Sequence, residues 1–279
     1  MAVDQMSAPL LDGRIAVITG GAGGIGGGVT RRLAAEGATV VVNDIDEGLL
    51  ATMVAAIEDG GGRIVPVLGD IRDSKTVARL AETAAAIDDD RIDVLVNNVG
   101  GFRPTGAFLS AGEENWAAMY SINLEHVFRC TKAIAPMMIA KGRGSIVNVS
   151  TVEAIRGMPG MPVYSAFNAG IIAFTRSVAV DLGRYGIRVN VIAPDLADTI
   201  ATPAKAQLNG RSPAMTAHWS PLGRFGQPDE YGNVVLFLAS DLSSFMTGSV
   251  LPVDGGTLAA AGWYLRMDKK RFTQSPDAP

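Results

Sequence analysis

The sequence predicts an α/β fold in which one open, parallel, seven-stranded sheet carries helices on both faces. Three observations predict it: near-continuous apolar runs typical of strands covered on both faces, helical patterns between them, and a glycine-rich turn directly after the first run. No break in composition divides the chain, so a single domain is expected. It covers residues 13–258, between an N-terminal extension (1–12) and a C-terminal tail (259–279).

The apolar runs give the strands, and the spacing of apolar residues between them gives the helices. The expected strands are Ile15–Thr19, Thr39–Asp44, Arg63–Leu68, Val94–Asn98, Ser145–Ser150, Arg188–Ala193 and Val250–Val253. Helical spacing covers Leu49–Ile57, Val77–Ile87 and about Glu113–Ala140, and an amphipathic helix begins near Pro162. Right-handed crossovers then produce a Rossmann-type sheet, whose ligands bind beyond the carboxyl ends of its strands.

The turn after the first expected strand predicts a site for a dinucleotide pyrophosphate. Residues 15–26 are IAVITGGAGGIG, and Ile25, Val29 and Leu33 then share one helical face. Backbone N–H groups and the positive end of the helix dipole bind phosphate there, and glycine permits its close approach. Asp44 ends the second run, where a carboxylate accepts hydrogen bonds from ribose hydroxyls and repels a 2′-phosphate. The cofactor predicted is therefore NAD rather than NADP.

Bulk properties exclude several other classes of function. The formal net charge is −4 and no basic cluster lies outside the last residues, so nucleic acid is not an expected partner. Residues 1–12 lack an apolar signal core and no apolar run is long enough to span a membrane, so a soluble, cytoplasmic protein is expected. The single cysteine excludes an intrachain disulfide, and two scattered histidines predict no metal site.

Two segments lack a sustained pattern. Residues 195–227 show little periodicity, and a loop of this length in a compact domain favours a lid or binding loop over disorder. The tail from residue 259 is equally compatible with a frayed end and with a subunit contact.

The segment PVYSAFNAG places Tyr164 and Asn168 one helical turn apart, which alone predicts only a solvated helix face. The order of several motifs carries more information. TGGAGGIG, NNVG, VNVST before YSAFN, RYGIRVNVIAP, PLGRFGQPDE and TGSVLPVDGG are similar, in order and spacing, to segments of the short-chain dehydrogenase/reductase family. The resemblance covers nearly all of residues 10–257. It implies hydride transfer between a nicotinamide and a carbinol or carbonyl carbon, commonly in a homotetramer.

The resemblance also implies catalytic roles. Tyr164 exchanges a proton with the substrate oxygen, Thr151 hydrogen-bonds that oxygen with Ser150 as the fallback, and Asn123 holds a water of the proton relay. Asn168 departs from the family, which has lysine here to bind the nicotinamide ribose and to lower the tyrosine pKa. Without that charge we expect a weakened or alkaline-shifted enzyme, in which alcohol oxidation suffers more than ketone reduction.

The cofactor contacts implied by the resemblance lie along the same strand ends. They are Gly20, Gly23, Gly24, Ile25 and Gly26 in the turn, Asp44 at the ribose, Asp70 and Ile71 at the adenine, Asn97 and Gly100 on the adenosine side, Tyr164 and Asn168 at the nicotinamide ribose, and Pro194 and Thr199 at the carboxamide. Gly23 stands where NADP-using relatives carry a basic residue, in agreement with Asp44. Asp195 stands where the family usually has glycine.

The leading hypothesis is an NAD-dependent oxidoreductase acting on a hydrophobic secondary alcohol or ketone. The apolar candidates near the pocket mouth are Phe102, Met158, Met161, Met215 and Trp219. Two alternatives stay open: a non-redox dehydratase, isomerase or cyclase that uses Tyr164 and Thr151 for acid–base work, and a catalytically silent NAD-binding protein. The fold alone excludes neither.

Overall fold

A computed structural model describes residues 8–103, 108–109, 112–260, 264–265 and 272–273. Its main sheet has seven parallel strands in the order β3-β2-β1-β4-β5-β6-β7. The strands are β1 (Ile15–Thr19), β2 (Thr39–Asp44), β3 (Arg63–Leu68), β4 (Val94–Asn97), β5 (Gly144–Val149), β6 (Ile187–Pro194) and β7 (Val250–Val253). The chain winds outward from β1 to β3 and then from β4 to β7, so the predicted fold class is confirmed.

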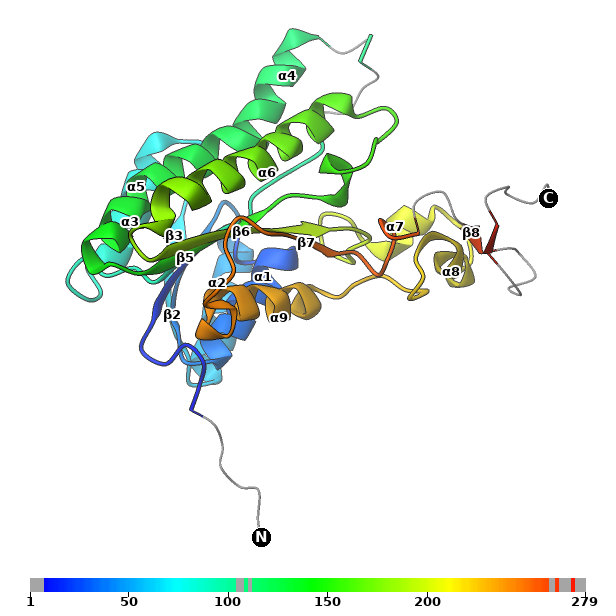
Figure 1. Cartoon of the computed structure of the whole chain (residues 1–279). Coiled ribbons are helices and arrows are strands. Elements are labelled where there is room, and N and C mark those ends of the chain that lie inside the picture. The colour runs from blue at the N-terminus through cyan, green and yellow to red at the C-terminus, as the bar shows by residue number, and fades with distance from the viewer. Residues whose placement is uncertain (1–7, 104–107, 110–111, 261–263, 266–271, 274–279) are drawn as a thin grey trace.

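Helices cover both faces of this sheet (Figure 1). One face carries α1 (Gly24–Ala35), α2 (Glu47–Asp59) and α9 (Pro228–Ala239), and the other carries α3 (Ser74–Ala85), α4 (Glu113–Tyr120), α5 (His126–Lys141) and α6 (Pro162–Gly183). Side chains of β1 alternate between the two layers: Ala16 and Ile18 pack toward α1, and Ile15 and Val17 pack toward α3 and α5. This is why the strands are apolar at nearly every position.

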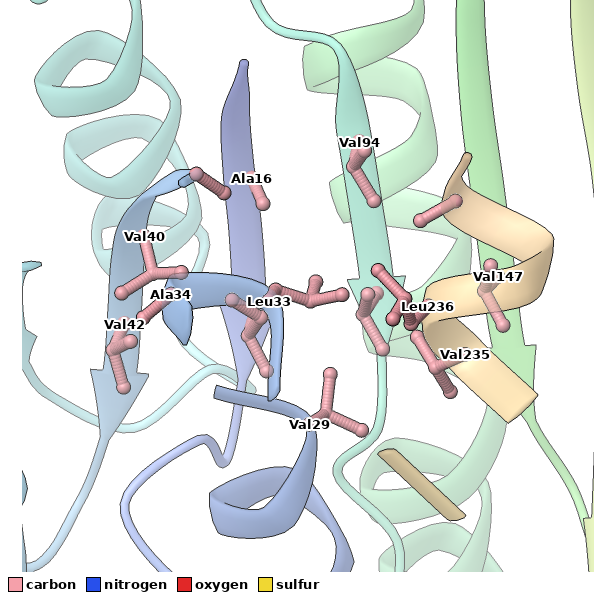
Figure 2. Packing of buried hydrophobic residues seen from close by; sticks show 14 of the residues in the cluster. Ala16, Val29, Leu33, Ala34, Val40, Val42, Val94, Val147, Val235 and Leu236 are labelled. Atoms are coloured by element: carbon pink, nitrogen blue, oxygen red, sulfur yellow. The ribbon is translucent and has the colours of Figure 1, made fainter. Parts of the chain in front are cut away.

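The side chains between the sheet and the helices α1 and α9 form one buried apolar cluster. Val40 and Val94 on the sheet pack with Leu33 of α1 and with Val235 and Leu236 of α9 (Figure 2). Each fully buried side chain of this size contributes about 2 kcal/mol. The helix α9, which the sequence analysis did not single out, begins with Pro228 and a capping box formed by Gln227 and Glu230, and these were the available sequence signals.

Element boundaries agree with the prediction except at a few ends. β1, β2, β3 and β7 have the predicted bounds, while β4 ends one residue earlier, β5 begins and ends one residue earlier, and β6 is longer by one residue at each end. The predicted helix over about 113–140 is interrupted by a π-helical turn, η1 (Ser121–Glu125). Residues 195–227 include two short helices, α7 (Ala204–Leu208) and α8 (Thr216–Trp219). In the tail, β8 (Tyr264–Leu265) pairs with β9 (Phe272–Thr273) and contacts α8.

Among the residues that the structure describes, one helix, α6, is long and apolar enough to cross a membrane by length and composition alone. Its buried residues include Asn168, Ile171, Ile172 and Thr175, and α6 packs against β6 in the sheet layer. We therefore interpret α6 as a core helix of this domain.

A histidine is fully enclosed where η1 meets α5. Burial lowers the pKa of His126 to about 4, because the charged ring would lose its hydration. The Val99 and Ile122 carbonyls and the Asp70 carboxylate favour the charged ring, but neither ring nitrogen makes a well-aligned hydrogen bond among the described residues. The folded protein therefore holds this ring neutral.

This histidine makes folding stability depend on pH. The unfolded chain binds a proton below its ordinary pKa of about 6.5, whereas the fold does so only near 4, so stability is lost as pH falls between these values. The loss is at most about 3 kcal/mol. Urea unfolding should show His126→Leu with a flatter stability profile across this window. If both proteins lose the same free energy of unfolding between pH 6.5 and 4, the loss does not come from His126. The lowered pKa values of Asp70 and Glu230 reduce stability mainly at more acidic pH, and they do so in both proteins.

Candidate functional site

The glycine turn between β1 and α1 is shaped for close approach of a ligand. Gly20 and Gly24 have φ values of +61° and +54°, which favour glycine. A Cβ at Gly26 would lie 2.1 Å from the Gly20 carbonyl oxygen, so only glycine fits where α1 starts. The N-cap of α1, Gly23, provides no side-chain cap, and the first turn has no acidic residue. The N–H groups of this turn, including that of Ile25, are therefore suited to an anion.

Asp44 lies at the same turn, as expected from its place at the end of β2. Its Oδ2 accepts a hydrogen bond from the Ala22 N–H (3.0 Å), and its Oδ1 accepts from the N–H groups of Ile45 (2.8 Å) and Asp46 (3.2 Å). These bonds fix a carboxylate beside the glycine turn.

The segment after β6 reaches the turn from the other side. A Cβ placed on Gly24 would lie 3.5 Å from the Cβ of Thr199, and one placed on Gly23 would lie 3.5 Å from Cδ1 of Ile200. The structure thus brings the predicted contact Thr199 together with the predicted glycines. It also shows Ile200, which the sequence analysis had not singled out.

The two asparagines at the end of β4 have different surroundings. Asn97 is fully buried, and its Nδ2 donates to Asn148 Oδ1 (2.8 Å) on β5 and to Thr131 Oγ1 (3.4 Å) on α5, so this side chain lies in the core between the sheet and α5. Successive side chains of a strand point to opposite sides, and Asn98 is the asparagine that faces the turn. Its Nδ2 donates to the carbonyl oxygens of Thr19 (3.0 Å) and Gly20 (3.1 Å). The sequence places Asn98 at the end of the fourth expected strand but does not show which of the two asparagines faces the turn.

Of the two residues expected at the adenine, Asp70 is partly exposed and Ile71 is buried. Asp70 forms a bidentate ion pair with Arg72, with a closest N···O distance of 2.6 Å, and this guanidinium lowers the pKa of the Asp70 carboxyl. Ile71 is buried in the core near Val67 and Val77. Only Asp70 of the two keeps part of its side chain exposed at this edge.

The carboxyl end of β5 meets the start of α6 at a pair of hydroxyls. The Thr151 hydroxyl lowers the pKa of the Tyr164 phenol, and its Oγ1 hydrogen-bonds the Pro194 carbonyl oxygen (3.4 Å) at the end of β6. Ser150 points elsewhere, because its Oγ donates to the Asn168 carbonyl oxygen (3.0 Å) on α6. The hydroxyl that faces the phenol is therefore that of Thr151.

The phenol is held in its neutral form by its surroundings. Burial raises the pKa of Tyr164, the Thr151 hydroxyl lowers it, and the carboxylates of Glu153 and Asp195 raise it. The net direction is upward. Asn168 is buried one turn further along α6, and its Nδ2 donates to the Tyr164 carbonyl oxygen (3.0 Å). An amide next to the tyrosine supplies no charge that would offset this shift.

Asn123 joins the interrupted helix to the segment after β4. Its Oδ1 accepts from the Gly101 N–H (3.1 Å), and its Nδ2 donates to the carbonyl oxygens of Gly101 (2.9 Å) and Met119 (3.0 Å). A Cβ on Gly100 would lie 3.4 Å from this Oδ1. The π turn η1, a feature often found at functional sites, thus packs Asn123 against the predicted contact Gly100.

Other candidate groups serve packing. Trp219 meets Phe225 edge-on with ring centroids 6.5 Å apart. Burial raises the pKa of the Cys130 thiol to about 12, so this cysteine is unreactive. Among the described residues, no group of histidine, cysteine and acidic side chains could hold a metal ion.

Comparisons with known proteins agree with this geometry. A family model described as "Enoyl-(Acyl carrier protein) reductase" matches residues 20–257. The chain is 41% identical over 246 residues to "3-oxoacyl-[acyl-carrier-protein] reductase FabG" of Thermotoga maritima, covering 88% of this chain and 98% of that protein. It is 40% identical over 246 residues to "Cis-4-hydroxycyclohexanecarboxylate dehydrogenase" of Sinomonas cyclohexanicum, covering 88% and 97%.

Solved structures resemble it over a similar extent. Levodione reductase superposes with a TM-score of 0.82 at 30% identity, covering 90% of this chain and 99% of that one. A 7α-hydroxysteroid dehydrogenase, solved in complex with NADH and 7-oxo glycochenodeoxycholic acid, gives a TM-score of 0.81 at 32% identity, covering 89% and 96%.

Proposed function

This chain belongs to the short-chain dehydrogenase/reductase family, and on that basis we propose that it is an NAD-dependent oxidoreductase that interconverts a hydrophobic secondary alcohol and its ketone. The observation that carries the proposal is the position of the Thr151 hydroxyl, which comes just after β5 and lowers the pKa of the Tyr164 phenol in the first turn of α6. Both residues lie at the carboxyl edge of the sheet, the edge that also holds the glycine turn, because β1 and β5 are both parallel to β4.

The residues of the glycine turn fit a dinucleotide. A Cβ at Gly26 would fill the space where α1 begins, and the first turn of α1 carries no competing acid. Gly20, Gly24 and Gly26 would hold the pyrophosphate, and Asp44 the adenosine ribose. When bound, the nicotinamide supplies or accepts the hydride. The related steroid dehydrogenase was solved with NADH, a cofactor of this class.

Within the site, each polar group has one proposed task. Tyr164 exchanges the proton with the substrate oxygen, and Thr151 hydrogen-bonds that oxygen. Asn168 orients the nicotinamide ribose, and Asn123 supports the water relay from the π turn. Of these two neighbouring hydroxyls, we assign the substrate contact to that of Thr151, because the Ser150 hydroxyl donates to the Asn168 carbonyl oxygen on α6.

Activity measurements test the proposal. Purified protein is assayed for a change in NADH absorbance with secondary alcohols and ketones of increasing apolar size, including 4-hydroxycyclohexanecarboxylate and a 3-oxoacyl thioester. Turnover with at least one pair is expected, and Tyr164→Phe should lower it by about 10²-fold or more, since the proton donor is removed. Product formed without net change in the cofactor would favour a dehydratase, isomerase or cyclase. Tight NAD binding without any product would favour a silent NAD-binding protein.

Cofactor choice is tested separately by calorimetry. The protein should bind NAD⁺ at least about tenfold more tightly than NADP⁺, and Asp44→Asn, which keeps an oxygen acceptor but removes the charge, should reduce that preference by about tenfold. Asp46→Asn is the matched control, because Asp46 caps α2 through the Leu49 N–H and asparagine caps equally well. Equal affinities of the unaltered protein for both nucleotides would refute the choice of NAD.

The absent charge at residue 168 makes a further prediction. A unit charge about 5 Å from the phenol, at an effective dielectric near 20, is worth roughly 3 kcal/mol, or about 2 pKa units. Asn168→Lys should therefore move the pH–rate profile of alcohol oxidation to lower pH and raise the rate at neutral pH, with less change in ketone reduction. Asn168→Met is the uncharged control of similar length. If Asn168→Lys and the unaltered protein have the same profile, this account of Asn168 fails.

The homotetramer implied by the family resemblance is also proposed here. Val180 on α6 and Phe245 before β7 are large apolar side chains exposed on the single chain, which an interface between subunits would bury if it covered them.

A further inference from the structure

An arginine joins the two segments that surround the Thr151 hydroxyl, and the function proposed above gives it no task. The Arg156 guanidinium donates through Nη2 to Glu153 Oε1 (2.8 Å) and to Asp195 Oδ2 (2.7 Å). Its Nε also donates to Glu153 Oε2 (3.4 Å). The two carboxylates are largely buried, with side chains 14% and 15% exposed, so salt and water screen these ion pairs little. One guanidinium thus connects the segment after β5 to the residue after β6.

The Thr151 hydroxyl is hydrogen-bonded on both sides, next to the same two acids. Its Oγ1 accepts from the Glu153 N–H (3.3 Å) and donates to the Pro194 carbonyl oxygen (3.4 Å). Glu153 therefore bonds Thr151 through its backbone and Arg156 through its side chain, while Pro194 directly precedes Asp195. The bonds and the chain close a ring, whose members are Thr151, Glu153, Arg156, Asp195 and Pro194.

The Pro194 side of this ring is held by the sheet and by α9. Pro194 is the last residue of β6 and pairs with Val253 of β7. The Asp195 N–H donates to the Val253 carbonyl oxygen (3.3 Å), and its own carbonyl oxygen accepts from the Tyr231 hydroxyl (2.8 Å) on α9. Its Oδ2 also accepts from the Thr257 hydroxyl (2.6 Å). This side gives the ring a fixed reference point.

The Glu153 side is a single short turn. It is the 3₁₀ helix η2 (Val152–Ala154), of which Thr151 is the N-cap residue. The Arg156 N–H donates to the Val152 carbonyl oxygen (3.0 Å), which places Arg156 at the end of this turn. Hydrogen bonds of a 3₁₀ turn have poorer geometry than those of an α-helix. The ion pair of Arg156 with Asp195 therefore adds a tie from this turn to the sheet.

The two bonds of the Thr151 hydroxyl suit a group that must exchange one partner for a substrate. The distance of 3.4 Å to the Pro194 carbonyl oxygen is long for a hydrogen bond between oxygens, so this bond is weak. A substrate oxygen can take over the proton at small cost, while the bond from the Glu153 N–H keeps Oγ1 in place. A hydroxyl that accepts a hydrogen bond is also polarised as a donor.

The charge of this cluster argues against direct binding of a substrate anion by the arginine. Arg156 is paired with two carboxylates, so the three side chains together carry one net negative charge. A cluster of this sign repels an anionic group instead of attracting it. The bonds of Arg156 therefore point to a task within the protein.

We infer that Arg156 is a positioning residue for the Thr151 hydroxyl: it holds the N–H group that donates to this hydroxyl and the carbonyl oxygen that accepts from it at a fixed separation. The inference rests on the proposed function for the contact between Thr151 and the substrate oxygen. Without the guanidinium, the carboxylates of Glu153 and Asp195, which now share one Nη2 atom, would repel each other. The two partners of the hydroxyl would then move apart, and the hydroxyl would lose its single orientation.

A double-mutant cycle separates positioning from simple stabilisation. Thr151→Val removes the hydroxyl and should lower kcat by about 10²-fold. Arg156→Met should lower kcat by about tenfold with KM within about twofold, because the bond to the substrate oxygen strengthens as charge develops there. In the Thr151→Val protein, the same Arg156→Met change should alter kcat by less than about twofold. Arg31→Met, which breaks the exposed ion pair of Arg31 with Asp229 between α1 and α9, is the matched control and should leave kcat unchanged.

The orientation of the Thr151 side chain is measured by NMR, independently of turnover. The protein is labelled with ¹³C at the Cγ2 of threonine, and the signal of Thr151 is the one missing from Thr151→Val. Three-bond couplings from Cγ2 to the backbone nitrogen and carbonyl carbon report χ1. The couplings should correspond to one rotamer in the unaltered protein and to an average over rotamers in Arg156→Met.

The outcomes distinguish the inference from the proposed function. Unchanged couplings and kcat, or a lower melting temperature alone, would overturn the inference, and so would an equal loss of kcat with and without the Thr151 hydroxyl. If Arg156→Met does not fold, Glu153→Ala decides, because it removes one arm of the bridge and keeps the backbone N–H; the same results are expected of it. Averaged couplings in a protein without redox turnover would refute the proposed function and keep the positioning role.

Discussion

The parallel register of the seven strands is the constraint on which the site depends. Every strand from β1 to β7 ends at the same edge. Asp44 and Pro194 are the last residues of their strands, and Gly20 and Thr151 come just after theirs, so all four lie at this edge. Because both faces of the sheet are covered by helices, polar side chains with chemical tasks have this edge as the open place to gather (Figure 1). The parallel sheet with helices on both faces thus determines both where the core packs and where the polar candidate residues gather.

Much of this arrangement could be predicted from sequence, because apolar runs fix where strands stop and glycine fixes where the backbone turns. Asp44 and Thr151 lie where the ends of β2 and β5 place them. Asn97 and Asn98 could not be separated, since a shift of one residue along a strand reverses the side that a side chain faces. The π turn was missed because it depends on bonds from Asn123 to Gly101, outside the helix. The pair of Arg156 and Asp195 joins residues 39 apart, which no local pattern encodes.

The surroundings of the Tyr164 phenol favour its neutral form. Burial is the main cause of its raised pKa, and the nearby carboxylates act in the same direction. Asn168 donates its amide to the Tyr164 carbonyl oxygen and brings no positive charge that would offset this shift.

The bonds of Asp195 also position the segment that reaches the glycine turn. Asp195 accepts from Arg156, Thr257 and the Leu196 N–H, and Leu196 takes a left-handed φ of +45°. Four residues beyond Asp195 the chain places Thr199 against Gly24 in the turn between β1 and α1. Contacts between residues distant in sequence thus fix both ends of this short segment, and none of them is encoded by a local pattern.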